Sequence, residues 1–402
     1  MTFMKIIDIH SLRVLMMLSV LMAFASISTD LYLPALPMMG VSLNANTGAT
    51  ELTISGYLVG FSLGQLVWGP IGDRYGRRLP IIIGLIFFII GSVGCAVSLS
   101  VEMLIGWRII QAVGACASVV LARAMVRDFY SGDRAAQMMS ILMTVMAIAP
   151  LLGPWVGGQI LDFASWRAIF WVLVGIGLLT LVALYWLPES LPREHRNHES
   201  LRYAFVNYGE LLRNRQLLGY AGVGGFFYGG IYAYIAGTPF AYITYHHVSP
   251  QLYGVLFGTG IVGIMVANQI SSKLVKRFGS DGLMRSGTVG AALAGVLLAI
   301  AARTGWGGLM GLVIPLFVFV SASGFIVANA IVGALNSTLK HAGSASALIG
   351  AIQYGTGILG SALVGVYTDR TPYPMGFLIA LFGICSLLCA FFLVSVPPSK
   401  TG

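Results

Sequence analysis

Long stretches without a charged residue constrain this chain more than any other feature of its sequence. Among them are residues 79–101, 168–187, 252–272 and 375–396. An α-helix of roughly 20 apolar residues crosses the hydrocarbon core of a bilayer. The stretches are too long for transmembrane β-strands and lack their alternation of polar and apolar residues. With 57% hydrophobic and only 9% charged residues, the chain is predicted to be an all-α membrane protein.

Helices marked between the charged loops give twelve predicted transmembrane segments. Their spans are 12–33, 51–71, 80–98, 101–125, 135–160, 167–187, 216–243, 252–272, 284–302, 307–335, 343–368 and 374–396. A charge-rich segment separates the first six predicted helices from the last six. We therefore predict an N-terminal bundle at 1–187, a cytoplasmic linker at 188–215 and a C-terminal bundle at 216–402. Apolar residues recur in the linker at the spacing of an amphipathic surface helix: Leu201, Phe205, Tyr208, Leu211 and Leu212.

The two halves carry traces of a duplication. A shift of 203 positions aligns residues 74–76 (RYG) with residues 277–279 (RFG), and the same shift aligns Gly157 with Gly360. So few identities in glycine-rich helices also arise by chance. Two parallel halves around a central cavity are a design of secondary transporters, which bind substrate near the middle of the membrane. The predicted fold is therefore two pseudo-symmetric six-helix bundles.

Basic residues gather on one side of the predicted helices. Most of the 23 Lys and Arg residues fall in loops that share the cytoplasmic side if both termini lie there, as the positive-inside rule requires. The other side holds Arg167, Arg303 and Arg370. Membrane topology thus accounts for the net charge of +9. We expect no nucleic-acid partner, because such binding needs one continuous basic surface.

The sequence lacks the short motifs of common enzymes and nucleotide sites. HExxH and the Walker loop are missing, and the GxSxG pattern occurs only at residues 60–64, inside a predicted membrane helix. No zinc-site spacing joins the cysteines, which all fall within predicted helices: Cys95, Cys116, Cys385 and Cys389. We therefore expect no enzyme activity, no metal and no cofactor. An ion gradient is the expected energy source.

The strongest local pattern is GPIGDRYGRR at residues 69–78, between the second and third predicted helices. Its glycines permit a tight turn, and its arginines anchor the turn at the membrane surface. Asp73 is placed to cap a helix or to pair with an arginine. By itself the pattern is a polar turn.

The same pattern resembles the signature loop of the major facilitator superfamily. This resemblance implies a conformational role for the loop residues Gly69, Gly72, Asp73, Arg74, Gly76 and Arg77. Three more motifs agree with the resemblance. LIGWRIIQAVG at 104–114 resembles the fourth-helix motif of proton-coupled members, and APLLGPWVGG at 149–158 resembles the fifth-helix motif of antiporters. With STDLYLPALP at 28–37, they resemble the bicyclomycin and chloramphenicol resistance transporters. The resemblance implies a drug:proton antiporter of the bacterial inner membrane, surrounded by lipid. We expect it to be a monomer.

Two charged residues lie inside predicted helices, where charge is costly and usually functional. From the helical rise, Asp30 lies about 6 Å and Arg108 about 10 Å inside the outer boundary. Similar depth permits contact or coupling through water, so that Asp30 loads and releases a proton as their separation changes. In the simpler alternative, Asp30 faces interfacial water and Arg108 extends outward. The resemblance favours the proton role. Glu51 and Glu102, expected at helix starts near the outer surface, are the next candidates.

The fifth helix and the inner turn are predicted to serve the change between two conformations. Pro150 and Pro154 each remove a backbone donor and favour bends. Small residues allow tight contact with the other half: Gly153, Gly157 and Gly158. The resemblance implies a latch of the outward-facing state between Asp73, the arginines at the base of the fourth helix and the start of the eleventh helix. Arg127 and Asp128 end that fourth helix, where contact with lipid headgroups is the alternative.

A set of aromatic and amide side chains could line a substrate cavity, although tyrosines also anchor helices at membrane interfaces. The candidates are Tyr57, Gln111, Tyr228, Tyr232 and Tyr234. The predicted function is export of an amphipathic drug or metabolite by proton exchange. The alternatives are proton symport of a sugar or another organic solute and, lower, a membrane receptor without transport activity.

Overall fold

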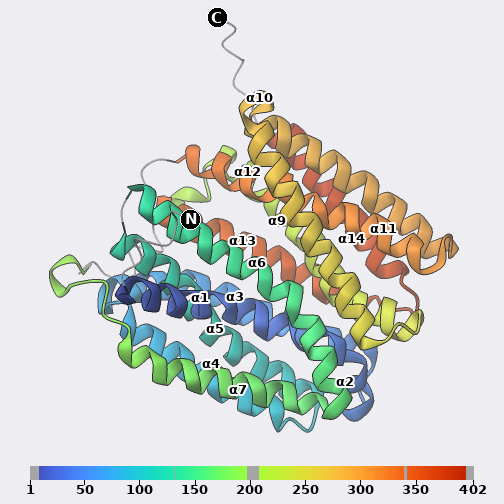
Figure 1. Ribbon diagram of the computed structural model, residues 1–402. Helices are drawn as coiled ribbons and strands as arrows, with labels where there is room; N and C mark the ends of the chain where they lie inside the picture. Colours follow the sequence, from blue (N-terminus) through green and yellow to red (C-terminus); the bar gives the residue numbers. More distant parts are fainter. Residues whose placement is uncertain (1–8, 131, 197–207, 339–341, 395–402) are drawn as a thin grey trace, which may run out of the picture.

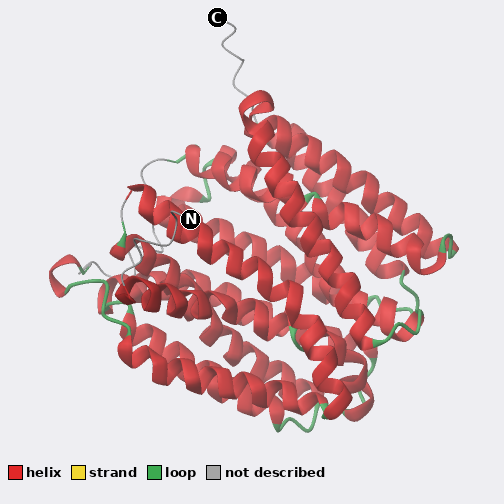
Figure 2. Ribbon diagram, in the orientation of Figure 1, coloured by secondary structure: helices red, strands yellow, loops and turns green. Residues whose placement is uncertain are grey.

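The computed structural model describes residues 9–130, 132–196, 208–338 and 342–394. Within these ranges the chain forms helices joined by short turns and contains no β-strand (Figure 2). The prediction of an all-α fold is confirmed.

The first half begins with a long helix and a short outer elbow. Its helices are α1 (Ile9–Asp30), η1 (Leu33–Ala35), α2 (Leu36–Ser42), α3 (Thr47–Tyr75), α4 (Arg78–Ala96), α5 (Val101–Phe129), α6 (Gly132–Phe163), α7 (Trp166–Ala183), η2 (Leu184–Trp186) and η3 (Arg193–His195). Side-chain caps define two of the starts: Asn46 accepts a bond from the Ala49 amide, and Ser100 accepts one from the Met103 amide. The first predicted span, 12–33, ends in the turn that carries Asp30.

The second half follows a similar plan with two differences from the predicted spans. Its helices are α9 (Arg215–Thr238), η4 (Pro239–Tyr245), α10 (Pro250–Thr304), α11 (Gly308–Ser321), α12 (Ser323–Asn336), α13 (Ala342–Val366), α14 (Tyr373–Leu388) and η5 (Cys389–Leu393). α10 covers two predicted helices, joined through a kink at Gly279 with φ 69° and ψ 164°. The predicted helix 307–335 is divided into α11 and α12 at Ala322.

The described helices form a multi-pass membrane protein. Eight segments are long and apolar enough to cross a bilayer, and α10 counts once among them although it holds two predicted helices. A total of twelve crossings therefore stays a prediction. The domain boundaries also stay predictions, since part of the linker, 197–207, lies outside the described residues.

Helices pack mainly within their own half of the chain. In the first half α5 packs on both α3 and α4, and in the second half α13 packs on α9 while α10 packs on α14 (Figure 1). The most extensive contacts between the halves are those of α3 with α13 and of α6 with α10. Small residues allow these approaches, because Gly48 lies against the backbone of Gly365, and Gly254 against that of Trp155.

Backbone geometry supports the duplication. Gly76 and Gly279, which the 203-residue shift aligns, both have positive φ, at 91° and 69°. Only glycine adopts this conformation without strain. Gly157 of α6 lies against the backbone of Leu31, just beyond α1, and its counterpart Gly360 of α13 lies against Gly229 of α9. Each half therefore packs its fifth predicted helix on its first segment through an equivalent glycine.

The molecule has two distinct ends. We call the end with the α3–α4 turn, rich in arginine, the arginine-rich end, and the opposite end, which carries α2, the α2 end (Figure 1). At the arginine-rich end the last part of the linker packs on the second half. Its Tyr208 and Leu211 form a buried cluster with Leu217, Ala345 and Leu348.

Candidate functional site

Arg108 is fully buried in the middle of the first half. Its guanidinium carbon lies 4.2 Å from the centre of the Tyr32 ring and 4.4 Å from that of Tyr57, so the two rings hold the cation through cation–π contacts. Nη1 donates to the carbonyl oxygen of Ser28 at 2.8 Å. Nε and Nη2 have no hydrogen-bond partner. The guanidinium therefore keeps buried N–H groups available for a further acceptor.

Asp30 ends α1, two residues after the backbone carbonyl that Arg108 binds, and is 5% exposed. Thr29 Oγ1 donates to its Oδ1 at 3.2 Å. No ion pair within 4.0 Å joins the described side chains of Asp30 and Arg108. Arg108 therefore binds the backbone of α1 two residues before Asp30. Direct contact between the Arg108 and Asp30 side chains would require α1 or the Arg108 side chain to move.

Gln111 lies behind Arg108 on the same helix and is fully buried. Its Oε1 accepts a bond of 2.5 Å from Arg108 Nη1, and its Nε2 donates to Ser92 Oγ at 2.8 Å. These two bonds fix the amide and orient the arginine. Gln111 is therefore placed as a positioning residue for Arg108, whereas the sequence analysis considered it for substrate contact.

Aromatic rings connect Arg108 with the second half of the chain. Tyr57 stacks near Phe61 at 6.1 Å between ring centres, and Phe61 lies 4.7 Å from Tyr354 of α13. Tyr354 in turn lies 6.1 Å from Tyr228 and 6.2 Å from Tyr232, both on α9. This aromatic path crosses from one bundle to the other.

The candidate tyrosines separate into two groups. Tyr228 and Tyr232 are partly exposed and share the aromatic path with Tyr354. Tyr234 is 5% exposed and stacks on Phe257 of α10 at 5.3 Å, on another side of α9. Sequence reasoning missed Phe61 and Tyr354. The only feature of the sequence that could have identified Tyr354 as a functional residue is its position as an aromatic residue within a glycine-rich helix.

The turn at the arginine-rich end is organised around Arg77. Its Nη1 lies 2.6 Å from Asp73 Oδ1, and its Nε lies 2.9 Å from Asp128 Oδ2 at the end of α5. Burial alone lowers the pKa of Arg77, but the hydrogen bonds and negative charges of Asp128 and Asp73 outweigh burial and raise this pKa above its usual value. The pairs therefore fasten the α3–α4 turn to α5.

Glu189, which follows α7 in the linker, completes this turn. Its Oε1 accepts a bond from the Arg77 amide at 2.8 Å, and its Oε2 accepts one from the Arg78 amide at 3.2 Å. A side chain at Gly76 would meet the ends of the Glu189 and Arg196 side chains, which would have to shift, and the positive φ at this position favours glycine. Sequence analysis treated Glu189 as one charge among many in the linker. Its position next to Pro188, where a helix must end, was the available signal.

The remaining residues of the turn are less tightly held. Gly72 faces Leu121 of α5 without room for a side chain, whereas a side chain at Gly69 would meet no neighbour within 4 Å. Arg74 and Arg127 are exposed. The predicted partner of the latch, the start of the eleventh helix, includes residues 339–341, which lie outside the described residues.

α6 is continuous through both of its prolines, Pro150 and Pro154. Its glycines do not all face the other half. Gly158 lies against the Pro250 carbonyl of α10, but Gly153 lies against Asp30 and Gly157 against Leu31. The expectation of contact with the other half is therefore correct for Gly158 and wrong for Gly153 and Gly157. Helical periodicity turns the latter two toward α1.

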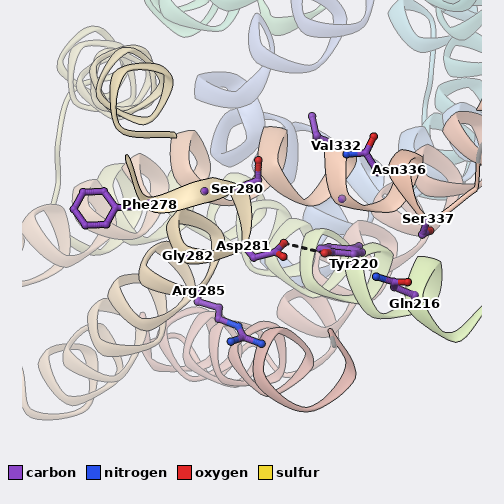
Figure 3. Close-up of a pocket in the computed structure, with 12 residues that line it drawn as sticks. Gln216, Tyr220, Phe278, Ser280, Asp281, Gly282, Arg285, Val332, Asn336 and Ser337 are labelled. Carbon is purple, nitrogen blue, oxygen red and sulfur yellow. Dashed lines mark hydrogen bonds between the residues drawn. The ribbon is translucent and has the colours of Figure 1, made fainter. Parts of the chain in front are cut away.

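A separate hollow lies beside the kink of α10 at the arginine-rich end (Figure 3). It has a volume of about 580 Å³. Tyr220 donates to Asp281 Oδ1 at 2.8 Å, whereas Arg285 is turned to the carbonyls of Ala390 and Val394. The repeat shift places Ser280 where the first half has Arg77. The second half thus lacks the guanidinium that closes the corresponding turn of the first.

Comparison with known proteins extends these observations. A family model described as Major Facilitator Superfamily matches residues 18–361. The uncharacterized MFS-type transporter YdgK of Bacillus subtilis is 35% identical over 93% of this chain and 94% of its own length. The bicyclomycin resistance protein homolog of Haemophilus influenzae and multidrug resistance protein D of Escherichia coli are each 29% identical, over 94% of this chain and 95% of their own lengths.

Solved structures agree on the fold. The xylose transporter XylE of Escherichia coli, in a partially occluded inward open conformation, matches with a TM-score of 0.74 and 17% identity, over 97% of this chain and 98% of that chain. These findings define a multi-pass membrane transporter. The chain belongs to the Major Facilitator Superfamily. The predicted family and the major facilitator fold are both confirmed.

Proposed function

We propose that this transporter exports amphipathic small molecules in exchange for protons. The observation that carries the proposal is the buried Arg108, which lies between two tyrosines, retains unpartnered N–H groups and lies close to the buried Asp30. An unpaired charge in a low-dielectric interior is costly. Arg108 therefore favours any arrangement that brings it a carboxylate or another acceptor.

Asp30 is the proton carrier in this proposal, and Arg108 is its switch. When α1 moves so that Asp30 reaches Nε or Nη2 of Arg108, the ionised carboxylate is stabilised and the proton leaves. When they separate, the buried carboxyl is stable only with a proton. Gly153 lies against Asp30, so movement of α6 is transmitted directly to this residue.

The aromatic path provides the substrate surface. Tyr228, Tyr232 and Tyr354 present ring faces between the bundles, and such faces accept flat apolar groups and organic cations of varied shape. Because Phe61 and Tyr57 continue the path to Arg108, a substrate on these rings alters the surroundings of the proton residues. The similarity to a bicyclomycin resistance protein homolog and to multidrug resistance protein D supports this substrate class.

The positive-inside rule supports an orientation with the arginine-rich end and both termini in the cytoplasm. The α2 end then faces outward, in the inner membrane of a bacterium. Lipid headgroups surround the exposed arginines, and a monomer contains every residue that the mechanism uses.

The test is transport by the purified chain in liposomes that contain a pH-sensitive dye, with ethidium as substrate. If transport is by exchange, ethidium should accumulate while protons move across the membrane in the opposite direction. A protonophore should abolish this accumulation, and ATP should have no effect on it. Ethidium and protons moving in the same direction would establish symport instead. Absence of flux of ethidium and of a panel of antibiotics, in liposomes that hold folded protein, would contradict a transport function.

A further inference from the structure

Glu51 is a buried carboxyl group that the mechanism above does not use. It lies in the first turns of α3 at the α2 end and is 3% exposed. Its Oε2 has no hydrogen-bond partner. Glu51 therefore lies near a helix start, as expected, and the second half of the chain covers it there.

The cavity at Glu51 is built by both bundles. The second half contributes Gly237 of α9, Phe240 of η4, Val364 of α13 and Met375 of α14, with the turn that joins the last two. Its volume is about 10 Å³, which is about the space for one water molecule. An ionised carboxylate cannot keep its hydration shell in that space.

No lining residue of this cavity other than Glu51 carries a charge. Thr371, which lies in the α13–α14 turn, donates its hydroxyl to Asp369 at 2.6 Å. Charged or titratable groups of the neighbouring elements lie outside the lining. They include Glu102 and Arg108 on α5, Tyr242 in η4, His246 and His247 after η4, Asp369 and Arg370 after α13, and Tyr373 at the start of α14. Among the described residues, the lining therefore provides no counter-ion for an ionised Glu51.

The bundles meet closely around this residue. The Gly48 and Gly365 backbones are in contact, and Ser55 and Ser361 share a hydrogen bond of 2.8 Å. Separation of α3 from α13 at the α2 end would open the cavity to water. The protonation of Glu51 is thus coupled by geometry to the approach of the two halves.

We propose that Glu51 is a second proton-binding residue of this transporter, which takes up a proton when the bundles close around it at the α2 end and releases it when they part. The proposal rests on the transport function proposed above. It adds a proton that is exchanged on one side of the membrane and drives closure there, separate from the proton carried by Asp30.

Spin labels at Leu99 and Trp306, both exposed near the α2 end of opposite halves, report closure as a distance measured by electron–electron resonance. The measurement is made across pH in Asp30→Asn, which removes the first proton site. If opening releases one proton from Glu51, the ratio of open to closed molecules should rise by up to about tenfold for each unit of increase in pH. Glu51→Gln, which keeps the shape without titrating, should remain closed at every pH.

The matched control is Glu102→Gln, an exposed carboxyl near the same end, which should leave the pH profile unchanged. Glu51→Asp, which keeps a titratable group, should retain a pH-dependent distance. A distance in Asp30→Asn that does not change with pH, or a pH dependence that survives Glu51→Gln, would overturn the proposal. The readout needs no substrate, so it is independent of the flux experiment that tests the transport function.

Discussion

Arg108 Nη1 lies 2.8 Å from the carbonyl oxygen of Ser28, which ties the middle of α5 to the last turn of α1. The bond holds the Arg108 guanidinium at Ser28, which lies two residues before Asp30 in the sequence. Because the same nitrogen also binds Gln111, the arginine is anchored on one side and free on the other. This asymmetry lets a single guanidinium keep its position while it gains or loses an acidic partner.

Arg108→Lys should reduce proton-driven ethidium transport at least about tenfold, although the charge is retained. Lysine lacks the planar group that contacts Tyr32, Tyr57, Ser28 and Gln111 together. Loss of one hydrogen bond to a charged group costs about 1.5–3 kcal/mol, enough for that reduction. Uptake into inverted membrane vesicles measures the effect, with the exposed Arg303→Lys as control. Normal transport by the lysine variant would show that charge alone is needed.

Asp30→Asn should abolish ethidium accumulation driven by a pH gradient, because the amide cannot release a proton. Exchange of labelled for unlabelled ethidium without a gradient should continue, since the shape of the site is kept. The pH dependence of ethidium affinity that arises from Asp30 should disappear in this variant, and any that remains should be removed by adding Glu51→Gln. The control is Glu194→Gln in the exposed part of the linker. Gradient-driven accumulation that persists in Asp30→Asn would move the proton site elsewhere.

Asp128→Asn should weaken the arginine-rich turn more than Asp73→Asn. The Asp128 side chain is 16% exposed and that of Asp73 is 52% exposed, so solvent screens the second pair more. We expect a loss of about 1.5–3 kcal/mol for Asp128→Asn and of about 1 kcal/mol or less for Asp73→Asn. Thermal unfolding and labelling of cysteine probes at each end measure stability and alternating access. Equal effects would show that screening does not separate the two pairs.

Gly157→Leu should obstruct the packing of α6 on the segment after α1, because its first side-chain carbon already overlaps the Leu31 carbonyl. Overpacking of this kind costs about 1–3 kcal/mol. Alternating access should suffer more than ethidium affinity, as cysteine labelling at the two ends and equilibrium binding will show. Gly175→Leu on α7, where no neighbour lies within 4 Å, is the matched control. If Gly157→Leu lost affinity but switched normally, α6 would have a binding role instead.

Tyr354→Ala should lower the affinity for ethidium by about two- to tenfold, because an aromatic contact contributes about 0.5–1.5 kcal/mol. Tyr354→Phe keeps the ring and should retain most of the affinity. Fluorescence titration of the purified variants compares them with Tyr185→Ala, which changes an exposed tyrosine outside the aromatic path. An unchanged affinity in Tyr354→Ala would remove the path between Phe61 and α9 from the substrate site.

The sequence predicted the helical membrane fold, because apolar composition and the length of uncharged segments depend only on the order of residues along the chain. Motifs at 28–37, 69–78, 104–114 and 149–158 indicated the family for the same reason. Burial of charge in apolar helices also pointed to Asp30 and Arg108 before their surroundings were known. Each of these signals is local.

Only the tertiary structure decided which groups meet across the chain. Ser55 reaches Ser361 and Phe61 reaches Tyr354, although about 300 residues separate each pair. The sequence placed Glu51 at a helix start, and the tertiary structure shows that the other bundle buries it there. Such contacts depend on how two bundles approach and rotate against each other. That geometry results from packing summed over many helices, and no local pattern in the sequence contains it.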